Sequence, residues 1–173
     1  MRKNLGKGGR RAAAATGLGL TLLCAAAIAQ DQPAEDGSRF FRVMPGEEHW
    51  VDYRGDGAQF GIKEAFILGD PNKPGPYVIR IKFPPGVMSS PHSHPEMRIG
   101  TVIKGTWWTG TGEKFDPKTA TPVPAGGMMV HPAGKVHYDG ARNEEVVVQM
   151  SGIGPSGKTT VDPNQPGFIR VPK

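Results

Sequence analysis

The sequence predicts an all-β protein whose short strands are joined by tight turns. The chain has 173 residues, about the size of one domain. Its 25 glycines and 17 prolines, together 42 of the 173 residues, are spread along the whole length without a fixed period. That spread excludes collagen and argues against a helical bundle. Hydrophobic residues make up 37% of the chain and aromatic residues 8%, so there is enough apolar material to argue against wholesale disorder.

The first 29 residues differ from the rest and predict a cleaved secretory signal. They contain five basic side chains and no acid, whereas the remaining 144 residues hold 16 basic and 16 acidic side chains. A basic start, an apolar run over 12–28 and small residues at Ala27 and Ala29 are typical of such a signal. The alternative is a membrane anchor, but the run is short for a span of about 20 residues and is diluted by glycine and threonine.

Cleavage would leave residues 30–173 as one mature domain, periplasmic or secreted, with no stable membrane association. Arg10-Arg11 leaves both Sec and twin-arginine export open. The formal charge of +5 for the whole chain falls to zero without residues 1–29, so a nucleic-acid partner loses its electrostatic support. Because Cys24 lies within the predicted signal, the exported domain has neither a disulfide nor a cysteine metal ligand.

Short apolar runs bounded by turn residues predict ten strands and no long helix. The run over 77–83 shows the pattern most clearly, because large apolar residues at odd positions alternate with Val, Arg and Lys at even positions. Residues 114–124 are expected to form an excursion between strands, and 153–173 a C-terminal tail laid over the body. The expected strands are 40–44, 50–53, 60–68, 77–83, 97–103, 106–109, 128–130, 137–139, 145–150 and 168–171.

Four of the five histidines fall between positions 92 and 137, in two groups that each follow a Gly/Pro turn. His92 and His94 are two residues apart, so in an extended chain both imidazoles point to the same side and can hold one ion. His137 follows the turn at 132–134, which can bring its strand alongside the first pair. The pattern predicts a divalent metal site of these three histidines, suited to Fe, Mn, Ni, Cu or Zn. The alternative is a set of surface or structurally buried histidines, which is also the expectation for His49.

At these residues the sequence resembles the cupins, small β-barrels of the jelly-roll type. The first cupin motif is glycine, five residues, His-x-His, three or four residues, glutamate, six residues, glycine. The second is glycine, five residues, proline-x-glycine, two residues, histidine, three residues, asparagine. The resemblance covers about 78–152 and implies a double-stranded β-helix with His92, His94 and His137 inside it. The positions in register are Gly86, His92, His94, Gly105, Gly126, Pro132, Gly134 and His137.

Two positions depart from the cupin pattern. Arg98 stands where the glutamate ligand belongs, and Ala141 where the asparagine belongs. A guanidinium cannot ligate a cation and repels it, so three interpretations stay open. The three histidines hold the ion alone while Arg98 clamps an anionic group of the substrate; or Glu96 replaces the missing ligand, unless it simply pairs with Arg98; or the metal is lost and the barrel is a binding module or scaffold.

His131 and the tryptophan pair, Trp107 and Trp108, are further candidates to line a ligand pocket. His131, just before Pro132, is a candidate acid/base or hydrogen-bond donor because an imidazole titrates near neutral pH; the alternative is an ordinary strand residue at the barrel mouth. Trp107 and Trp108 face opposite ways in a strand, so one of them can line the pocket, although core packing is the simpler role for both.

The sequence therefore predicts an exported, metal-binding, single-domain barrel that takes a small molecule. As an enzyme it would be a dioxygenase-like oxidoreductase acting on a small organic acid or oxygenated compound, with Arg98 and His131 as catalytic side chains. Isomerase and lyase chemistry stay open. The alternative is a non-catalytic barrel that binds or senses a small molecule. The resemblance alone implies a homodimer.

Overall fold

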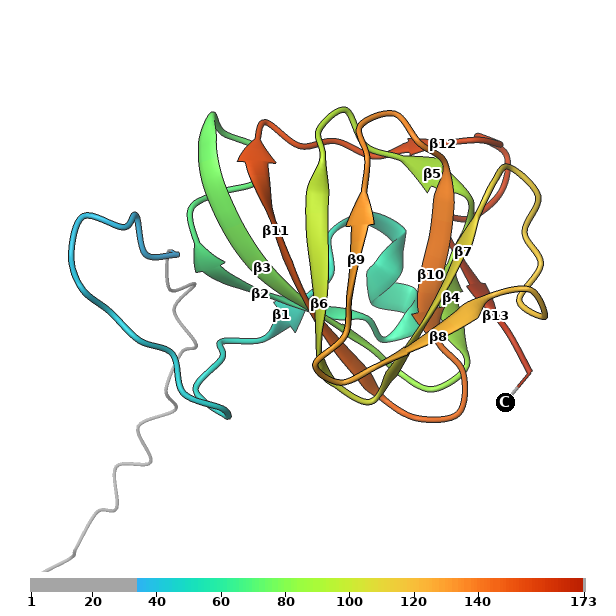
Figure 1. Ribbon diagram of the computed structural model, residues 1–173, viewed down its shortest axis with the longest axis horizontal. Helices are drawn as coiled ribbons and strands as arrows, with labels where there is room; N and C mark the ends of the chain where they lie inside the picture. Colours follow the sequence, from blue (N-terminus) through green and yellow to red (C-terminus); the bar gives the residue numbers. More distant parts are fainter. Residues whose placement is uncertain (1–33, 173) are drawn as a thin grey trace, which may run out of the picture. The chain divides into compact units, whose positions relative to one another are not determined.

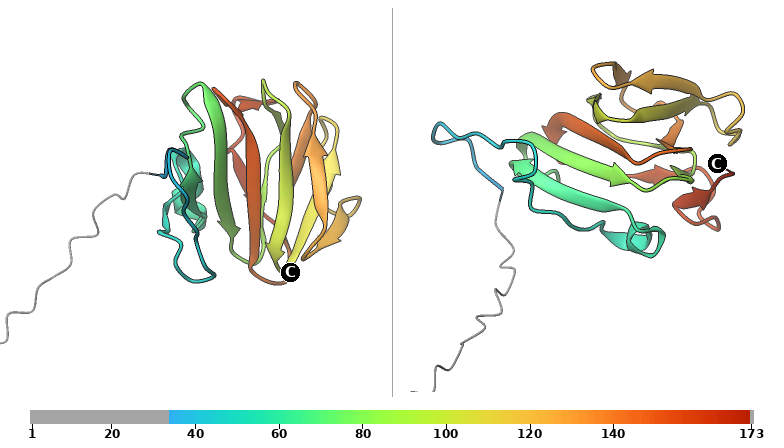
Figure 2. Two further views of the ribbon diagram at one scale, coloured as in Figure 1. Left: turned by 60° about the vertical axis from the view of Figure 1, so that its left-hand side comes forward. Right: turned by 90° about the horizontal axis from the view of Figure 1, so that it is seen from below.

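The computed structural model describes residues 34–172, which form two antiparallel β-sheets lying face to face (Figures 1 and 2). The predicted signal, 1–29, lies outside the described residues. The first sheet has the order β1 (Val51–Asp52), β2 (Lys63–Leu68), β3 (Gly75–Phe83), β11 (Val146–Gly154), β6 (Arg98–Lys104) and β9 (Met128–His131). The second has the order β12 (Thr159–Thr160), β5 (His92–Ser93), β10 (His137–Ala141), β4 (Val87–Ser89) and β13 (Phe168–Arg170), with β7 (Thr106–Thr111) paired to β10 and β8 (Thr121–Pro124) paired to β7.

The prediction of an all-β jelly roll is confirmed. The described helical segment is the short 3₁₀ helix η1 (Gly55–Phe60), and no described helix is long and apolar enough to cross a membrane. Among the described strands, hydrogen bonds join strands within each sheet, and the two sheets do not close into one continuous barrel.

The hydrophobic core fills the space between the two sheets. The alternation predicted for 77–83 is realised in β3, whose odd-numbered residues from Tyr77 to Phe83 are buried. They pack in one cluster with Val148 of β11 from the same sheet and with Trp107 and Phe168 from the opposite sheet. Because one cluster contains side chains of both sheets, burial of this apolar surface holds the sheets together.

Nine of the ten expected strands overlap a strand of the structure, and the expectation for 40–44 is wrong. Those residues form no strand. Phe40, Phe41 and Met44 are exposed, so the segment buries no apolar face that would hold it against a sheet. The expected excursion over 114–124 includes the unpredicted β8. Pro122 and Pro124 obscure this strand in the sequence, but β8 pairs only with β7, and an edge strand tolerates residues that lack an N–H.

The C-terminal segment is part of the second sheet rather than a covering tail. Strand β11 extends to Gly154, β12 pairs with β5, and β13 pairs with β4. The pairing of β12 places Thr160 opposite His92. The segment therefore braces the strand that carries the first predicted metal ligand.

Gly100 in β6 is predicted to be intolerant of a side chain. A Cβ at this position would lie 2.6 Å from the Trp107 ring and 3.0 Å from the Met150 sulfur. Overpacking of this kind costs about 1–3 kcal/mol, so Gly100→Ala should lower the free energy of unfolding by that amount in urea denaturation. Gly157→Ala is the control, because its nearest contact would be an ordinary 3.7 Å to Pro95. Equal stability of the two variants would contradict the packing described here.

Candidate metal centre

The pairing of strands brings two rows of side chains to the same level of the molecule. In the first sheet, Tyr77, Gly152, Arg98 and His131 are direct neighbours across β3, β11, β6 and β9. In the second sheet, His92 of β5 lies directly opposite His137 of β10. The two rows meet at His131 and His137, whose ring centroids are 3.7 Å apart.

His92, His94 and His137 form a buried cluster. Their ring centroids are separated by 4.8 Å for His92 and His94, 4.5 Å for His92 and His137, and 5.4 Å for His94 and His137. One ring nitrogen from each lies within 4.8 Å of the others. His94 follows the end of β5, and its carbonyl accepts a 2.7 Å hydrogen bond from Gly134 N–H in the turn before β10. That bond ties the turn carrying Gly134 to the segment carrying the first two histidines.

Main-chain carbonyls fix the tautomer of each ring in this cluster. His92 Nδ1 lies 2.7 Å from Ser90 O, His137 Nδ1 lies 3.1 Å from Lys135 O, and His94 Nδ1 is hydrogen-bonded to Gly157 O. A carbonyl only accepts, so each Nδ1 donates its proton and each neutral ring keeps a lone pair on Nε2. The Nε2 atoms of His94 and His137 are buried without a partner among the described residues. Three buried, convergent nitrogen lone pairs fit a divalent metal ion.

His131 has the opposite hydrogen bonding. Arg98 Nε donates to His131 Nδ1 at 3.4 Å, and an arginine has no lone pair to accept with. Nδ1 of His131 is therefore the acceptor, and its Nε2 carries the proton. A second group of converging atoms combines His131 with His137 and Asp139, but in this tautomer His131 offers a donor rather than a lone pair.

Arg98 is a buried cation without an acidic partner. Its exposed fraction is 8%, and no carboxylate of the described residues lies within 4 Å of the guanidinium.

Burial lowers the pKa of His94 to about 2, and the charge of Arg98 adds to this effect. Burial, followed by the neighbouring His137 and Arg98, also lowers the pKa of His131 to about 2.

Burial is likewise the main reason that the pKa of His92 falls well below its usual value and that the pKa of His137 is lowered. All four rings are therefore neutral at neutral pH, which is the form that a metal ligand or a neutral hydrogen-bond donor requires.

Glu96 lies outside the histidine cluster. Its Oε1 accepts hydrogen bonds from Tyr77 Oη at 2.8 Å and from Ser156 Oγ at 2.5 Å. It is not among the groups of converging ligand atoms, and it makes no ion pair with Arg98 within 4 Å. Strand β5 ends at Ser93 and Pro95 follows in a bend, so the alternation of side chains that would point position 96 toward the cluster does not continue.

Two residues near the centre were not predicted. Asp139 is buried on β10, and its Oδ2 lies 3.8 Å from His137 Nε2. The signal for it was present, because positions 137 and 139 of one strand point to the same side. The Lys158 ammonium donates to Gly167 O at 3.0 Å and lies 4.2 Å above the Phe168 ring. No local pattern marks Lys158, because its place depends on the pairing of β12 with β5.

The tryptophan pair divides as alternation predicts. Trp107 is buried with its ring centroid 5.5 Å from that of His131. Trp108 faces the other way, where the Arg142 guanidinium lies 4.5 Å above its ring. His49 is exposed and takes no part in the cluster.

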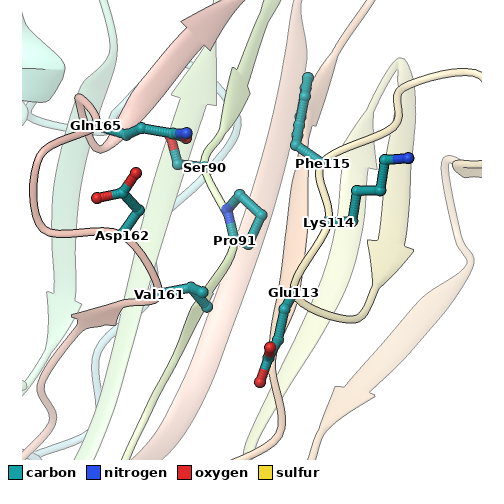
Figure 3. A pocket seen from close by; sticks show the side chains of 8 residues that line it. All are labelled: Ser90, Pro91, Glu113, Lys114, Phe115, Val161, Asp162 and Gln165. Atoms are coloured by element: carbon teal, nitrogen blue, oxygen red, sulfur yellow. The ribbon is translucent and has the colours of Figure 1, made fainter.

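A separate cavity of about 320 Å³ opens near β5 and β12 (Figure 3). Ser90, Asp162 and Gln165 lie on one side of it and Phe115 on the other. None of its described lining residues is a histidine, so it is distinct from the metal centre. It brings together acidic, basic and apolar groups without a concentration of any one kind.

The sequence matches no protein-family model and no curated protein. Several solved structures match in three dimensions. The polyketide cyclase RemF from Streptomyces resistomycificus shows 14% identity and a TM-score of 0.60 over 73% of this chain and 89% of that chain. The DMSP lyase DddQ from Ruegeria pomeroyi shows 16% and 0.55 over 69% and 64%. A cupin-like protein from Thermotoga maritima shows 23% and 0.48 over 57% and 76%.

The two motifs fall on strands that pair with each other within each sheet, β5 with β10 and β6 with β9. The three histidines of the motifs form one buried cluster. The chain has the cupin fold. The cupin motif glycines have clear backbone roles here: Gly105 has φ +76° between β6 and β7, and a Cβ there would lie 2.4 Å from Glu145 O. Gly134, in the turn before β10, also has a positive φ of +68°.

The neutral histidines of this chain predict a stability that rises with pH. In the unfolded chain a histidine takes up a proton near pH 6.5, whereas the folded rings stay neutral because their pKa values are lowered. Stability from this source is complete above about pH 6.5 and is lost as the pH falls toward 2, by up to about 1.4 kcal/mol per pH unit for each histidine. Urea denaturation of metal-free protein between pH 8 and 5 measures the slope.

His94→Gln should reduce this slope, whereas His49→Gln should not, because His49 lies on the surface outside the cluster. A free energy of unfolding that does not change between pH 8 and 5 would contradict the neutral, buried state of the rings.

Proposed function

We propose that this chain is an exported, metal-dependent enzyme that uses His92, His94 and His137 to hold a divalent ion and acts on a small organic acid or oxygenated compound. The observation that supports it most directly is the hydrogen bonding of the three rings. Each donates Nδ1–H to a main-chain carbonyl, so each keeps its lone pair on Nε2 within a buried cluster. Among the described residues, Nε2 of His94 and of His137 has no hydrogen-bond partner.

The chain's own residues perform three tasks in this proposal. The carbonyls of Ser90, Lys135 and Gly157 orient the ligand rings. Burial between the sheets restricts water and strengthens electrostatic interactions. The positive charge of Arg98 favours an anionic substrate. When bound, the ion would polarise a substrate oxygen as a Lewis acid or, if it is iron or another redox metal, support reaction with dioxygen.

A dioxygenase-like oxidoreductase is the first reaction class to test, because three nitrogen ligands leave open positions for both substrate and a further small molecule. Two structures of the same fold are named a polyketide cyclase and a DMSP lyase. Non-oxidative chemistry, in which the ion would act on the substrate as a Lewis acid, is therefore the second class to test. Export rests on the composition of residues 1–29. A homodimer would cover the exposed apolar side chains of Ile103, Met128 and Val130 on β6 and β9.

Elemental analysis of protein purified without chelators should show close to one transition-metal ion per chain. The double variant His92→Ala, His94→Ala should lose it, because His137 is then the only one of the three proposed ligands that remains. His49→Ala is the matched control and should retain the metal, because that histidine lies outside the cluster. A folded wild-type protein that contains no metal, and gains no stability from added Zn²⁺, Mn²⁺ or Fe²⁺, would favour a non-catalytic binding barrel instead.

Oxygen uptake by the metal-loaded protein in the presence of catechols, thiols or keto acids tests the reaction class. For the oxidative reaction, uptake should depend on substrate and fall at least about tenfold in the His92→Ala, His94→Ala variant, in line with loss of the metal. Substrate loss without oxygen uptake would assign the site to Lewis-acid chemistry and overturn the oxidoreductase.

A further inference from the structure

Two buried N–H groups and one buried cation close to the histidine cluster lack an acceptor or an acidic partner among the described residues. Trp107 Nε1 and His131 Nε2 are both fully buried and without a partner. The Arg98 guanidinium, 8% exposed, donates through Nε to His131 but has no acid within 4 Å. Buried donors without acceptors are costly, by about 1–3 kcal/mol each and more for a charged group. Their clustering indicates that an acceptor comes from outside the protein.

The direction of the Arg98–His131 hydrogen bond decides what His131 contributes. Because Arg98 Nε donates to Nδ1, the ring presents Nε2–H as a donor. Arg98 is thus a positioning residue for His131 as well as a cation in its own right. The His131 ring packs against the ring of His137, with 3.7 Å between their centroids, so this donor belongs to a ring in contact with one of the three proposed ligands.

The surrounding residues leave the charge of Arg98 unbalanced. Its neighbour across the first sheet is Gly152, which has no side chain. The carboxylate of Glu96 is engaged by Tyr77 and Ser156, and that of Asp139 lies next to His137 Nε2 instead. A buried cation without a compensating anion is strongly unfavourable, so an anion at this position would restore the balance.

Trp107 completes the group from the opposite sheet. Its ring packs between Gly100 and His131, with a ring centroid distance of 5.5 Å to His131. The tight fit against Gly100 restricts how the indole can move, so the unpartnered Nε1–H is held in place. Trp107 therefore brings a donor from the second sheet close to His131, whose ring in turn lies against that of His137.

We propose that Arg98, His131 and Trp107 form an anion subsite that binds the carboxylate of the substrate beside the metal ligands. The inference rests on the proposed function for its substrate and names that substrate as a carboxylic acid. The interior then has two halves: Nε2 lone pairs of His92, His94 and His137 for a cation, and N–H donors for an anion. The carboxylate that this chain lacks at position 98 is supplied by the substrate.

The chain contains three tryptophans, so its ¹H–¹⁵N spectrum has three indole N–H signals, and Trp→Phe variants assign them. Metal-free protein near neutral pH is titrated with acetate to about 100 mM, far above the millimolar affinity expected of charge-assisted contacts. The Trp107 signal should shift and saturate. The signals of Trp50 and Trp108 are internal controls, because these rings are covered by Lys82 and Arg142 elsewhere. Acetamide, which has nearly the same shape but no charge, should leave the Trp107 signal unchanged.

Arg98→Met should weaken the acetate response at least about tenfold through loss of the charge-assisted contact, and His131→Phe should weaken it less. Arg142→Met is the matched control and should respond like the wild type. Long-range ¹H–¹⁵N spectra of the imidazoles should show the Nε2–H tautomer for His131 and the Nδ1–H tautomer for His92, His94 and His137.

A Trp107 signal that ignores acetate, responds equally to acetamide, or saturates unchanged in Arg98→Met would overturn the subsite. The wild-type comparison of acetate with acetamide decides even if Arg98→Met fails to fold. The metal is absent throughout, so the outcome is independent of the proposed function. If elemental analysis finds no metal in the purified protein but acetate still binds, the proposed enzyme is wrong and the anion subsite stands. If the purified protein holds metal but acetate does not bind the metal-free form, the anion subsite is wrong and the proposed function stands.

Discussion

The chemistry of this protein's interior depends on which ring nitrogen of each buried histidine carries the proton. Three rings donate Nδ1–H to main-chain carbonyls and present lone pairs, whereas His131 accepts from Arg98 and presents a proton. One residue type thus takes two opposite roles within a few ångströms. Because burial holds all four rings neutral, the hydrogen-bond partner, rather than the ring's own titration, sets each role.

The partners of the three ligand rings differ in how the fold supplies them. Ser90 and Lys135 each lie two residues before the histidine they orient, so these two bonds are local. The third acceptor, Gly157 O, comes from a segment 63 residues away that enters β12. The position of this carbonyl depends on the pairing of β12 with β5. Further along the chain, the pairing of β13 with β4 holds the same C-terminal segment in place. The C-terminal residues are therefore part of the site, although they lie outside both cupin motifs.

Alternation and spacing were sufficient to predict the all-β class, most strands and the convergence of His92, His94 and His137. What they could not supply depends on contacts between distant segments. The orientation of His131 requires β9 to pair with β6 so that Arg98 becomes its neighbour, and Lys158 approaches the centre only through β12. Glu96 was a candidate ligand because strand parity was extended through Pro95, whereas Tyr77 and Ser156 hold it elsewhere. Asp139 is different: two residues after His137 on the same strand, it was predictable and was overlooked.

Arg98 stands where the cupin motif that this sequence resembles has a glutamate, so its charge is opposite to the one that motif contributes. Three neutral imidazoles would leave a bound divalent ion with its full charge, and Arg98 adds another positive charge nearby. Asp139 supplies one buried carboxylate near His137, which balances only part of this. Like charges close together in a poorly solvated interior repel strongly. A divalent ion would therefore be held less firmly here than in a site that has a glutamate ligand in place of Arg98. An anion between the two cations removes that repulsion, and ion and anion therefore favour each other's binding.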